Sequence, residues 1–182
     1  MGLTNYKFTS MDQVTDVEAK GYYAEYLEKM SAPCASQEAQ CIQVLSYLPA
    51  VLAELYPALF DLVLCDAPCS GLGVIRRKPE IREKSLADVA SLPDTQWNIL
   101  CRAAELVKPG GVLQYSTCTL NKAENEEIAA RFLAEHPDFE KRILPLTSCF
   151  EKAGLAPSHE ITLFPHLHGT DGFYIASFAR KG

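Results

Sequence analysis

Short apolar runs, each closed by a break that contains proline or glycine, mark the predicted strands of this chain. Residues 60–65 form an almost continuous apolar run, which is typical of a strand buried on both faces of a parallel sheet. Residues 111–115 form a second such run, directly after the break at Pro109 and Gly110. Two later runs, at 161–164 and 173–178, predict a closing pair of antiparallel strands.

Between these strands the apolar residues take a helical spacing. Residues 94–107 predict an amphipathic helix with Asp94 as its N-cap. Residues 124–133 predict another helix, whose acidic residues favour the positive end of the helix dipole. A helix that leads into a buried strand is half of a β-α-β unit. The region 60–182 therefore predicts an α/β fold with a largely parallel sheet.

Residues 1–59 follow a different pattern. Apolar residues recur every three to four positions over 16–30, and a similar spacing predicts a helix over 36–47 that resumes over 50–56. The glycines of this segment, Gly2 and Gly21, belong to no glycine-rich loop. We therefore divide the chain into a helical segment, 1–59, and an α/β region, 60–182.

Composition adds limits to this picture. A chain of 182 residues with 48% hydrophobic content can form one domain with a real core. It has no apolar run that could span a bilayer and no apolar signal segment, so we expect a cytoplasmic protein. Its seven cysteines lack the regular spacing of a disulfide scaffold or of a metal-ligand set. We therefore predict reduced thiols and no metal.

The charge is uneven along the chain. The formal net charge is −6, which is unfavourable for binding the phosphates of a nucleic acid. Residues 76–84, however, contain five basic residues and two acidic ones. Such a stretch is either a solvated loop or a contact for a substrate backbone, and the sequence leaves both interpretations open.

Two cysteines stand where predicted strands end. Cys69 follows the run 60–65, and Cys118 follows the run 111–115. Ligands of open α/β sheets bind beyond the carboxyl ends of the strands, so two thiols at two such ends can face one pocket. The alternative is that each cysteine only packs in the core, as buried cysteines usually do.

The residues around these thiols carry a resemblance to a known family. The segments 66–73 (Asp-Ala-Pro-Cys-Ser-Gly-Leu-Gly) and 76–81 resemble one motif of the Sun/Nop-type RNA cytosine-5 methyltransferases, and 108–119 resembles another. Residues 124–126 and 169–174 match in the same order. The resemblance covers residues 60–182 and implies the C-terminal strands of a Rossmann-like methyltransferase sheet. Members of bacterial character act on ribosomal RNA with S-adenosylmethionine as cofactor.

The resemblance also implies roles for particular residues. Cys118 is expected to attack C6 of cytosine, and Cys69 to assist product release, because a covalent adduct makes the electron-poor C5 nucleophilic. Asp66 is expected between the methyl donor and the base, and Pro68 beside the donor. The target base must leave its stack, and the flanking RNA backbone is expected on a basic set of three residues, Arg76, Arg77 and Lys78.

One family feature is missing from the sequence. The family has a glycine-rich donor-binding loop upstream of the motif at 66–73, and residues 1–59 hold no such loop. Two hypotheses follow: the catalytic half of an RNA cytosine-5 methyltransferase, or a non-catalytic RNA-binding or assembly fragment. The sheet strands that this loop connects are expected to be missing or replaced by helices. The exposed sheet edge that results favours self-association.

Overall fold

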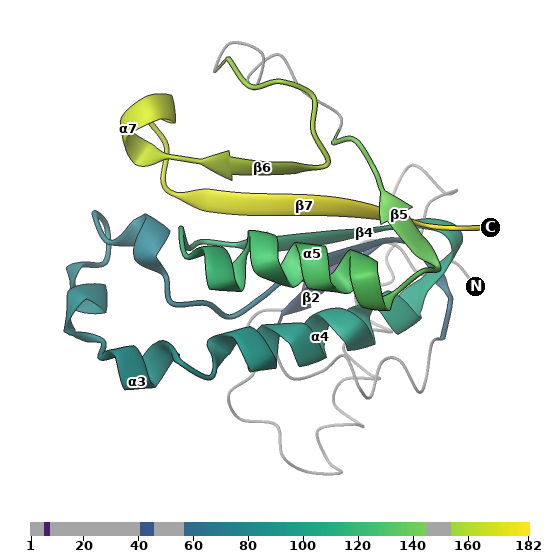
Figure 1. Cartoon of the computed structure of the whole chain (residues 1–182), viewed down its shortest axis with the longest axis horizontal. Helices are drawn as coiled ribbons and strands as arrows, with labels where there is room; N and C mark the ends of the chain where they lie inside the picture. The colour runs from purple at the N-terminus through teal and green to yellow at the C-terminus, as the bar shows by residue number, and fades with distance from the viewer. Residues whose placement is uncertain (1–5, 8–40, 46–56, 145–153) are drawn as a thin grey trace.

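The computed structural model describes residues 6–7, 41–45, 57–144 and 154–182. These residues form a seven-stranded mixed sheet, and two long helices cover one of its faces (Figure 1). The strands are β1 (Tyr6–Lys7), β2 (Cys41–Leu45), β3 (Phe60–Asp66), β4 (Val107–Thr117), β5 (Phe139–Lys141), β6 (Glu160–Leu163) and β7 (Phe173–Arg180).

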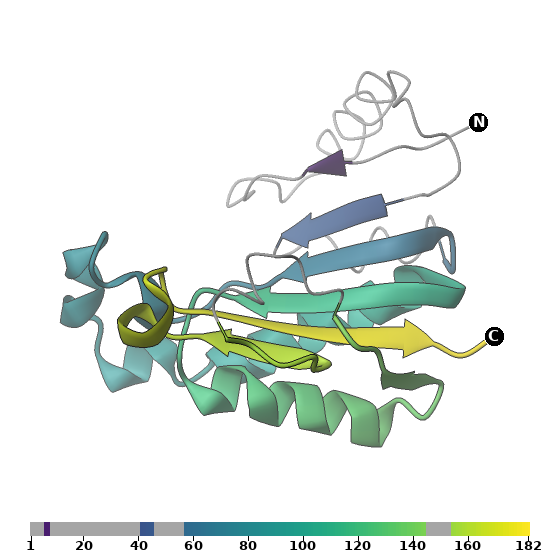
Figure 2. The same ribbon diagram turned by 90° about the horizontal axis from the view of Figure 1, so that it is seen from above.

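The sheet order explains how the site is assembled. The order is β1-β2-β3-β4-β7-β5, and β6 also pairs with β7. Strands β1 to β4 run parallel, whereas β7 is antiparallel to β4, β5 and β6 (Figure 2). In the register of β3 and β4, Asp66 lies opposite Ser116. The carboxyl ends of these two strands are therefore level with each other.

Helices connect the strands and supply the other side of the core. The α-helices are α3 (Leu86–Val89), α4 (Leu92–Leu106), α5 (Glu126–Glu135) and α7 (Pro165–His168), and the 3-10 helices are η1 (Leu72–Val74), η2 (Pro79–Glu83) and η3 (Lys122–Glu124). Helix α4 packs against β3 and β4 and also contacts α5. Its N-cap is Ser91 rather than the predicted Asp94. Asp94 instead lies in the first turn, where its charge favours the helix dipole.

The core lies between the sheet and helices α4 and α5. Its fully buried large side chains come from all of these elements: Phe60, Leu100, Leu106, Leu113, Tyr115, Phe132, Tyr174 and Phe178. Burial of each such side chain contributes about 1.5–3 kcal/mol. The core therefore fixes the β3 and β4 backbones from which the site loops emerge.

The structure confirms the α/β fold class and the predicted strands of region 60–182. It corrects the helix predicted over 36–47, because residues 41–45 form β2, which pairs in parallel with β3 over five residues. A short apolar run does not distinguish a helix from a strand by periodicity, and the β-branched Ile42 and Val44 suit a strand. The sheet also continues to β1, so two strands precede β3. This corrects the prediction that the strands upstream of β3 are missing or replaced by helices. The helices predicted over 16–30 and 50–56 lie outside the described residues.

Among the described residues, no helix has both the length and the apolar character needed to cross a membrane.

Candidate active site

The two predicted thiols lie side by side at the carboxyl edge of the sheet. Cys69 is in the loop that follows β3, and Cys118 comes directly after the last residue of β4. Their sulfur atoms are 3.3 Å apart. Both side chains are partly buried. The parallel pairing of β3 and β4 therefore brings together two cysteines that are separated by 49 positions in the sequence.

The surroundings of the two thiols shift their pKa values in opposite directions. Cys69 donates a hydrogen bond to Cys118, and this bond lowers the pKa of Cys118 to about 7. Lys78 lowers the pKa of Cys118 further, while burial and Asp66 oppose the effect. The same hydrogen bond, together with burial, raises the pKa of Cys69. Cys118 is thus the thiolate of the pair near neutral pH, and Cys69 keeps its proton.

Asp66 and Pro68 lie next to this pair. Asp66 is the last residue of β3, and its carboxyl group accepts a hydrogen bond from the Ser116 hydroxyl at 3.2 Å. Burial raises the pKa of Asp66, so protonation of this carboxyl is easier than for an exposed aspartate. The carbonyl oxygen of Pro68 accepts a hydrogen bond from Gln96 Nε2 at 2.9 Å.

The basic residues 76–78 divide into two groups. Arg76 and Arg77 are exposed and both face Asp171, with an Arg76–Asp171 separation of 3.9 Å and a closer pair between Arg77 and Asp171. Lys78 instead acts on Cys118 through its charge. A further lysine that the sequence did not single out, Lys84, donates to the Ser70 carbonyl at 3.1 Å.

Three motif loops meet through their backbones. The N–H of Gly73 donates to the Cys118 carbonyl at 3.0 Å, and the N–H of Gly172 donates to the Gly73 carbonyl at 2.8 Å. A Cβ atom on Gly73 would lie 2.1 Å from the Gly172 oxygen and 2.8 Å from the Cys118 oxygen. Only glycine fits at position 73. The late motif at 169–174 is therefore part of the thiol site.

Sequence reasoning missed the buried polar residues behind the thiols, which are Ser70, Gln96, Thr117, Thr119, Glu124 and Asn125. A signal for Gln96 was present, because it shares a helix face with the apolar residues Ile99, Leu100 and Ala103. Glu124 and Asn125 were interpreted only as part of a motif at the start of a helix. All six are at most 1% exposed, so burial selects them together.

A third cysteine has a different partner. Cys101, on α4, lies 3.4 Å from Nε2 of His136, and the His136 ring stacks on Phe132 with a centroid distance of 4.4 Å. Arg131 covers the nearby Trp97 ring at 3.8 Å. Burial raises the pKa of Cys101 to about 11. This thiol is therefore protonated at neutral pH despite its histidine neighbour.

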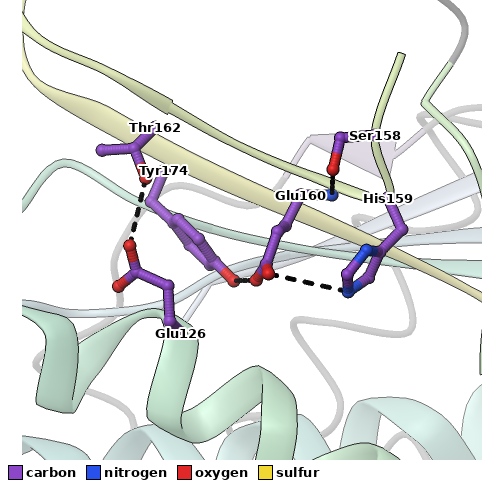
Figure 3. Close-up of polar contacts among 6 residues, drawn as sticks. All are labelled: Glu126, Ser158, His159, Glu160, Thr162 and Tyr174. Atoms are coloured by element: carbon purple, nitrogen blue, oxygen red, sulfur yellow. Dashed lines mark hydrogen bonds and ion pairs between the residues drawn. The ribbon is translucent and has the colours of Figure 1, made fainter. Parts of the chain in front are cut away.

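A second polar network joins β6 and β7 to the start of α5 (Figure 3). The Tyr174 hydroxyl donates to Glu160 Oε2 at 2.5 Å, and the Thr162 hydroxyl donates to Glu126 Oε1 at 3.3 Å. His159 lies 3.8 Å from Glu160. Burial raises the pKa of the Tyr174 hydroxyl, so this group remains a donor.

Within the described part of the chain, no group of three or more His, Cys, Asp or Glu side chains could hold a metal ion.

The parallel strands with a thiol pair at their carboxyl ends define a Rossmann-like α/β domain of the methyltransferase type. A crystal structure described as a methyltransferase homolog protein from Pyrococcus horikoshii has the same fold, with a TM-score of 0.55 and 31% identity. It covers 74% of this chain, and the chain covers 43% of that structure. The family model for 16S rRNA methyltransferase RsmB/F matches residues 8–179, and the chain belongs to this family.

Two further proteins are similar to this chain. A probable ribosomal RNA small subunit methyltransferase B from Bacillus subtilis is 46% identical over 130 residues, which are 68% of this chain and 28% of that protein. The crystal structure of NSun6 from Pyrococcus horikoshii with SFG has a TM-score of 0.51 and 30% identity, over 66% of this chain and 30% of that one. The chain thus spans less than a third of the length of the Bacillus relative.

The family match begins at residue 8, so it includes most of the segment 1–59, in which the sequence showed no family motif. The division of the chain at residue 59 stays a prediction.

Proposed function

We propose that this chain carries the catalytic cysteines of an S-adenosylmethionine-dependent ribosomal RNA methyltransferase that modifies C5 of cytosine. The observation that supports this most is the 3.3 Å separation of the Cys69 and Cys118 sulfur atoms. A thiolate is the nucleophilic form of cysteine. A pKa of about 7 makes a large fraction of Cys118 ready to attack at neutral pH.

The first step is addition of the Cys118 thiolate to C6 of a cytosine. A bond between sulfur and C6 forms, the C5–C6 double bond is lost, and electron density moves through C5 toward N3 of the ring. Asp66, the last residue of β3, is the carboxyl group that we assign to hydrogen-bond the N3/N4 edge of the ring at this stage. The adduct makes C5 nucleophilic.

We assign the methyl donor to the end of β3. S-adenosylmethionine, when bound, supplies a methyl group on a positively charged sulfur atom. Asp66 and Pro68 follow the buried part of β3, where ligands of open α/β sheets bind, and the partly buried Asp66 carboxyl faces the thiol side of that edge. These residues fit a donor site. The similarity to NSun6 solved with SFG, an analogue of this donor, supports the use of S-adenosylmethionine.

Release reverses the addition. After C5 has been methylated, the C5 proton is lost to a base, and its bonding electrons re-form the C5–C6 double bond and expel the Cys118 sulfur. The S–H group of Cys69 stabilises the departing thiolate, because it already donates to that sulfur. The RNA backbone on either side of the flipped base is assigned to Arg76, Arg77 and Lys78, whose charges suit phosphates.

The test compares cysteine variants of this chain, incubated with S-adenosylmethionine and a 16S rRNA transcript. We expect Cys69→Ala to accumulate a protein–RNA adduct that survives denaturation, and the double variant Cys69→Ala/Cys118→Ala to form none. An adduct that persists in the double variant would contradict the assignment of Cys118. Titration calorimetry with S-adenosylmethionine tests donor binding separately. No binding would favour the alternative, a non-catalytic RNA-binding or assembly fragment.

A further inference from the structure

Two consecutive buried residues hold the two thiols. Glu124 and Asn125 have no exposed surface, and they lie at the junction between η3 and α5. Glu124 contacts the loop of Cys69, whereas Asn125 contacts the segment of Cys118. A single turn of backbone therefore connects to both sides of the catalytic pair.

Glu124 acts on Cys69 together with Gln96. Its Oε2 atom accepts hydrogen bonds from the Ser70 backbone N–H at 2.9 Å and from Gln96 Nε2 at 2.8 Å. Gln96 Nε2 also donates to the Pro68 carbonyl at 2.9 Å. Because both partners of this nitrogen are acceptors, the orientation of the Gln96 amide is determined. The residues before and after Cys69 are thus held by one pair of side chains.

Asn125 does the same for Cys118. Its Oδ1 atom accepts from the Thr117 hydroxyl at 2.6 Å, and its Nδ2 atom donates to the Thr119 carbonyl at 3.0 Å. These are the residues before and after Cys118. The loop of Cys69 and the segment of Cys118 also contact each other directly, since the Ser70 and Thr119 hydroxyls lie 2.7 Å apart.

Hydrogen bonds from other elements hold Glu124 and Asn125 in place. The Tyr115 hydroxyl donates to the Glu124 carbonyl at 2.6 Å, and Asn121 Nδ2 donates to Glu124 Oε1 at 2.9 Å. The next residue, Glu126, accepts from Thr162 of β6 (Figure 3). Glu124 and Asn125 are therefore anchored to β4, to η3 and, through Glu126, to β6.

We infer that Glu124 and Asn125, with Gln96, are positioning residues that set the separation of the Cys69 and Cys118 sulfur atoms. They contact neither thiol directly, and act through the residues on either side of each cysteine. The meaning of this inference for catalysis rests on the proposed function. The separation itself is a property of the chain, and it is measurable without RNA or methyl donor.

The physical consequence concerns the hydrogen bond between the sulfurs. This bond is the largest influence on the ionisation of Cys118, and a hydrogen bond weakens steeply when its geometry is lost. Glu124→Gln replaces one of the two acceptor oxygens with an NH₂ group, so the three donors that face them, Ser70 N–H, Gln96 Nε2 and Asn121 Nδ2, can no longer all be satisfied. The remaining oxygen is a neutral acceptor, which holds the Ser70 N–H more weakly than a carboxylate does, and the Cys69 loop shifts. The Cys69 S–H group then no longer donates well to the Cys118 sulfur, and the pKa of Cys118 rises.

The experiment measures the rate of iodoacetamide labelling at Cys118 from pH 5.5 to 9.5, resolved by mass spectrometry of the Cys118 peptide. For Glu124→Gln we expect the midpoint of the pH profile to rise by about one unit, with a roughly fivefold slower rate at pH 7. Asn125→Ala is expected to shift the midpoint in the same direction. Glu127→Gln is the matched control, because Glu127 is an exposed acid in the first turn of the adjoining helix α5, and its profile is expected to match that of the unmodified chain.

Circular dichroism and thermal melting show whether each variant is folded, and a general loss of structure would change the labelling of every cysteine rather than only the midpoint for Cys118. If Glu124→Gln does not fold, Gln96→Met is measured in its place, since this variant removes the hydrogen bond from Gln96 to the Pro68 carbonyl and leaves Glu124 unchanged. A midpoint within 0.2 units of the unmodified chain (about 1.6-fold in the ratio of thiolate to thiol) in a folded variant would overturn the inference. An equal shift in Glu127→Gln would overturn it too. Failure of RNA methylation, by contrast, would count only against the proposed function.

Discussion

Cys118 and Cys101 each have a partner within hydrogen-bonding reach, but the partners affect the two thiols differently. Cys101 lies beside a histidine, which is the neighbour usually associated with an activated cysteine. Burial nevertheless raises the pKa of Cys101 to about 11. Cys118 lies beside a second thiol, and its pKa is lowered to about 7.

The pKa values of the two cysteines differ because different hydrogen-bond donors and charges surround each sulfur atom. At Cys118, a thiol donor, a backbone N–H and the charge of Lys78 all favour the thiolate. At Cys101, the nearby charges come as opposing pairs, with Arg131 and Arg102 against Glu135 and Glu105, so burial decides. The presence of a basic side chain is therefore a poor indicator of a reactive thiol, and the number of donors aimed at the sulfur is a better one.

The largest expected effect is in the labelling rates of these two cysteines. At pH 7 about half of Cys118 is ionised but only about one part in ten thousand of Cys101. The Cys101 thiolate is the stronger nucleophile because its pKa is higher, which offsets part of this difference. We expect Cys118 to react with iodoacetamide about 10²-fold faster, as measured by peptide mass spectrometry.

The pH profiles sharpen this comparison. The Cys118 rate should rise through pH 7 and level off above it, whereas the Cys101 rate should still be rising at pH 9.5. Equal rates at pH 7 would show that the two environments do not differ as described.

The next effect is on folding around Cys118. Gly73→Ala places a methyl group against the Gly172 and Cys118 carbonyl oxygens. We expect a loss of about 2 kcal/mol in the free energy of unfolding, measured by urea denaturation, and a disturbed Cys118 profile with an unchanged Cys101 profile. Gly110→Ala is the control: it has the strain of a positive φ of 78° but no atom within 4 Å. A Gly73→Ala variant no less stable than Gly110→Ala would contradict the close backbone packing.

A smaller effect is expected when the donor at Cys118 is removed. Cys69→Ala deletes the hydrogen bond that most lowers the pKa of Cys118, so the pKa should rise toward that of an ordinary thiol. We expect Cys118 labelling at pH 7 to slow about fivefold to tenfold. Cys101→Ala removes a thiol of the other region and should leave the Cys118 rate unchanged. A rate that does not fall in Cys69→Ala would mean that burial, Lys78 and the backbone alone set the acidity of Cys118.

The smallest effect is expected at the exposed arginines. Arg77→Ala breaks a surface pair with Asp171, and such pairs contribute at most about 1 kcal/mol to stability. If Arg77 contacts a phosphate, the variant lowers the salt dependence of RNA binding by about one unit of slope. Fluorescence titration at several KCl concentrations measures this. Arg102→Ala, which breaks the corresponding pair with Glu105 on α4, should leave the slope unchanged, and an equal change in both variants would exclude a specific role for Arg77.

The sequence was informative where local pattern and sheet rules coincide. The buried runs that became β3 and β4 were recognisable, and parallel neighbours bring their carboxyl ends together, so the meeting of Cys69 and Cys118 followed from the motifs. Residues 41–45 were mistaken for a helix because five residues of mixed apolar character do not define a period. Their strand conformation is instead determined by pairing with β3.

The residues that support the thiols could not be predicted from the sequence, for a different reason. Gln96 contacts Pro68 and Glu124, each 28 positions away in the sequence, and Arg77 contacts Asp171. Nothing local marks such pairs, because they depend on how α4 and the late loop pack on the sheet. The position of the polar Gln96 on an otherwise apolar helix face was the sequence feature that pointed to such a residue.

The backbone contact between Gly172 and Gly73 has a consequence for the order of events during folding. Strand β7 lies between β4 and β5, so the centre of the sheet is completed by residues far along the chain. Contacts between distant positions form slowly, because long loops must close first. The hydrogen bond from the Gly172 N–H to the Gly73 carbonyl therefore forms only after the segment that leads into β7 has joined the sheet. Until then, the Gly73 loop lacks one of the two backbone hydrogen bonds that hold it beside Cys118.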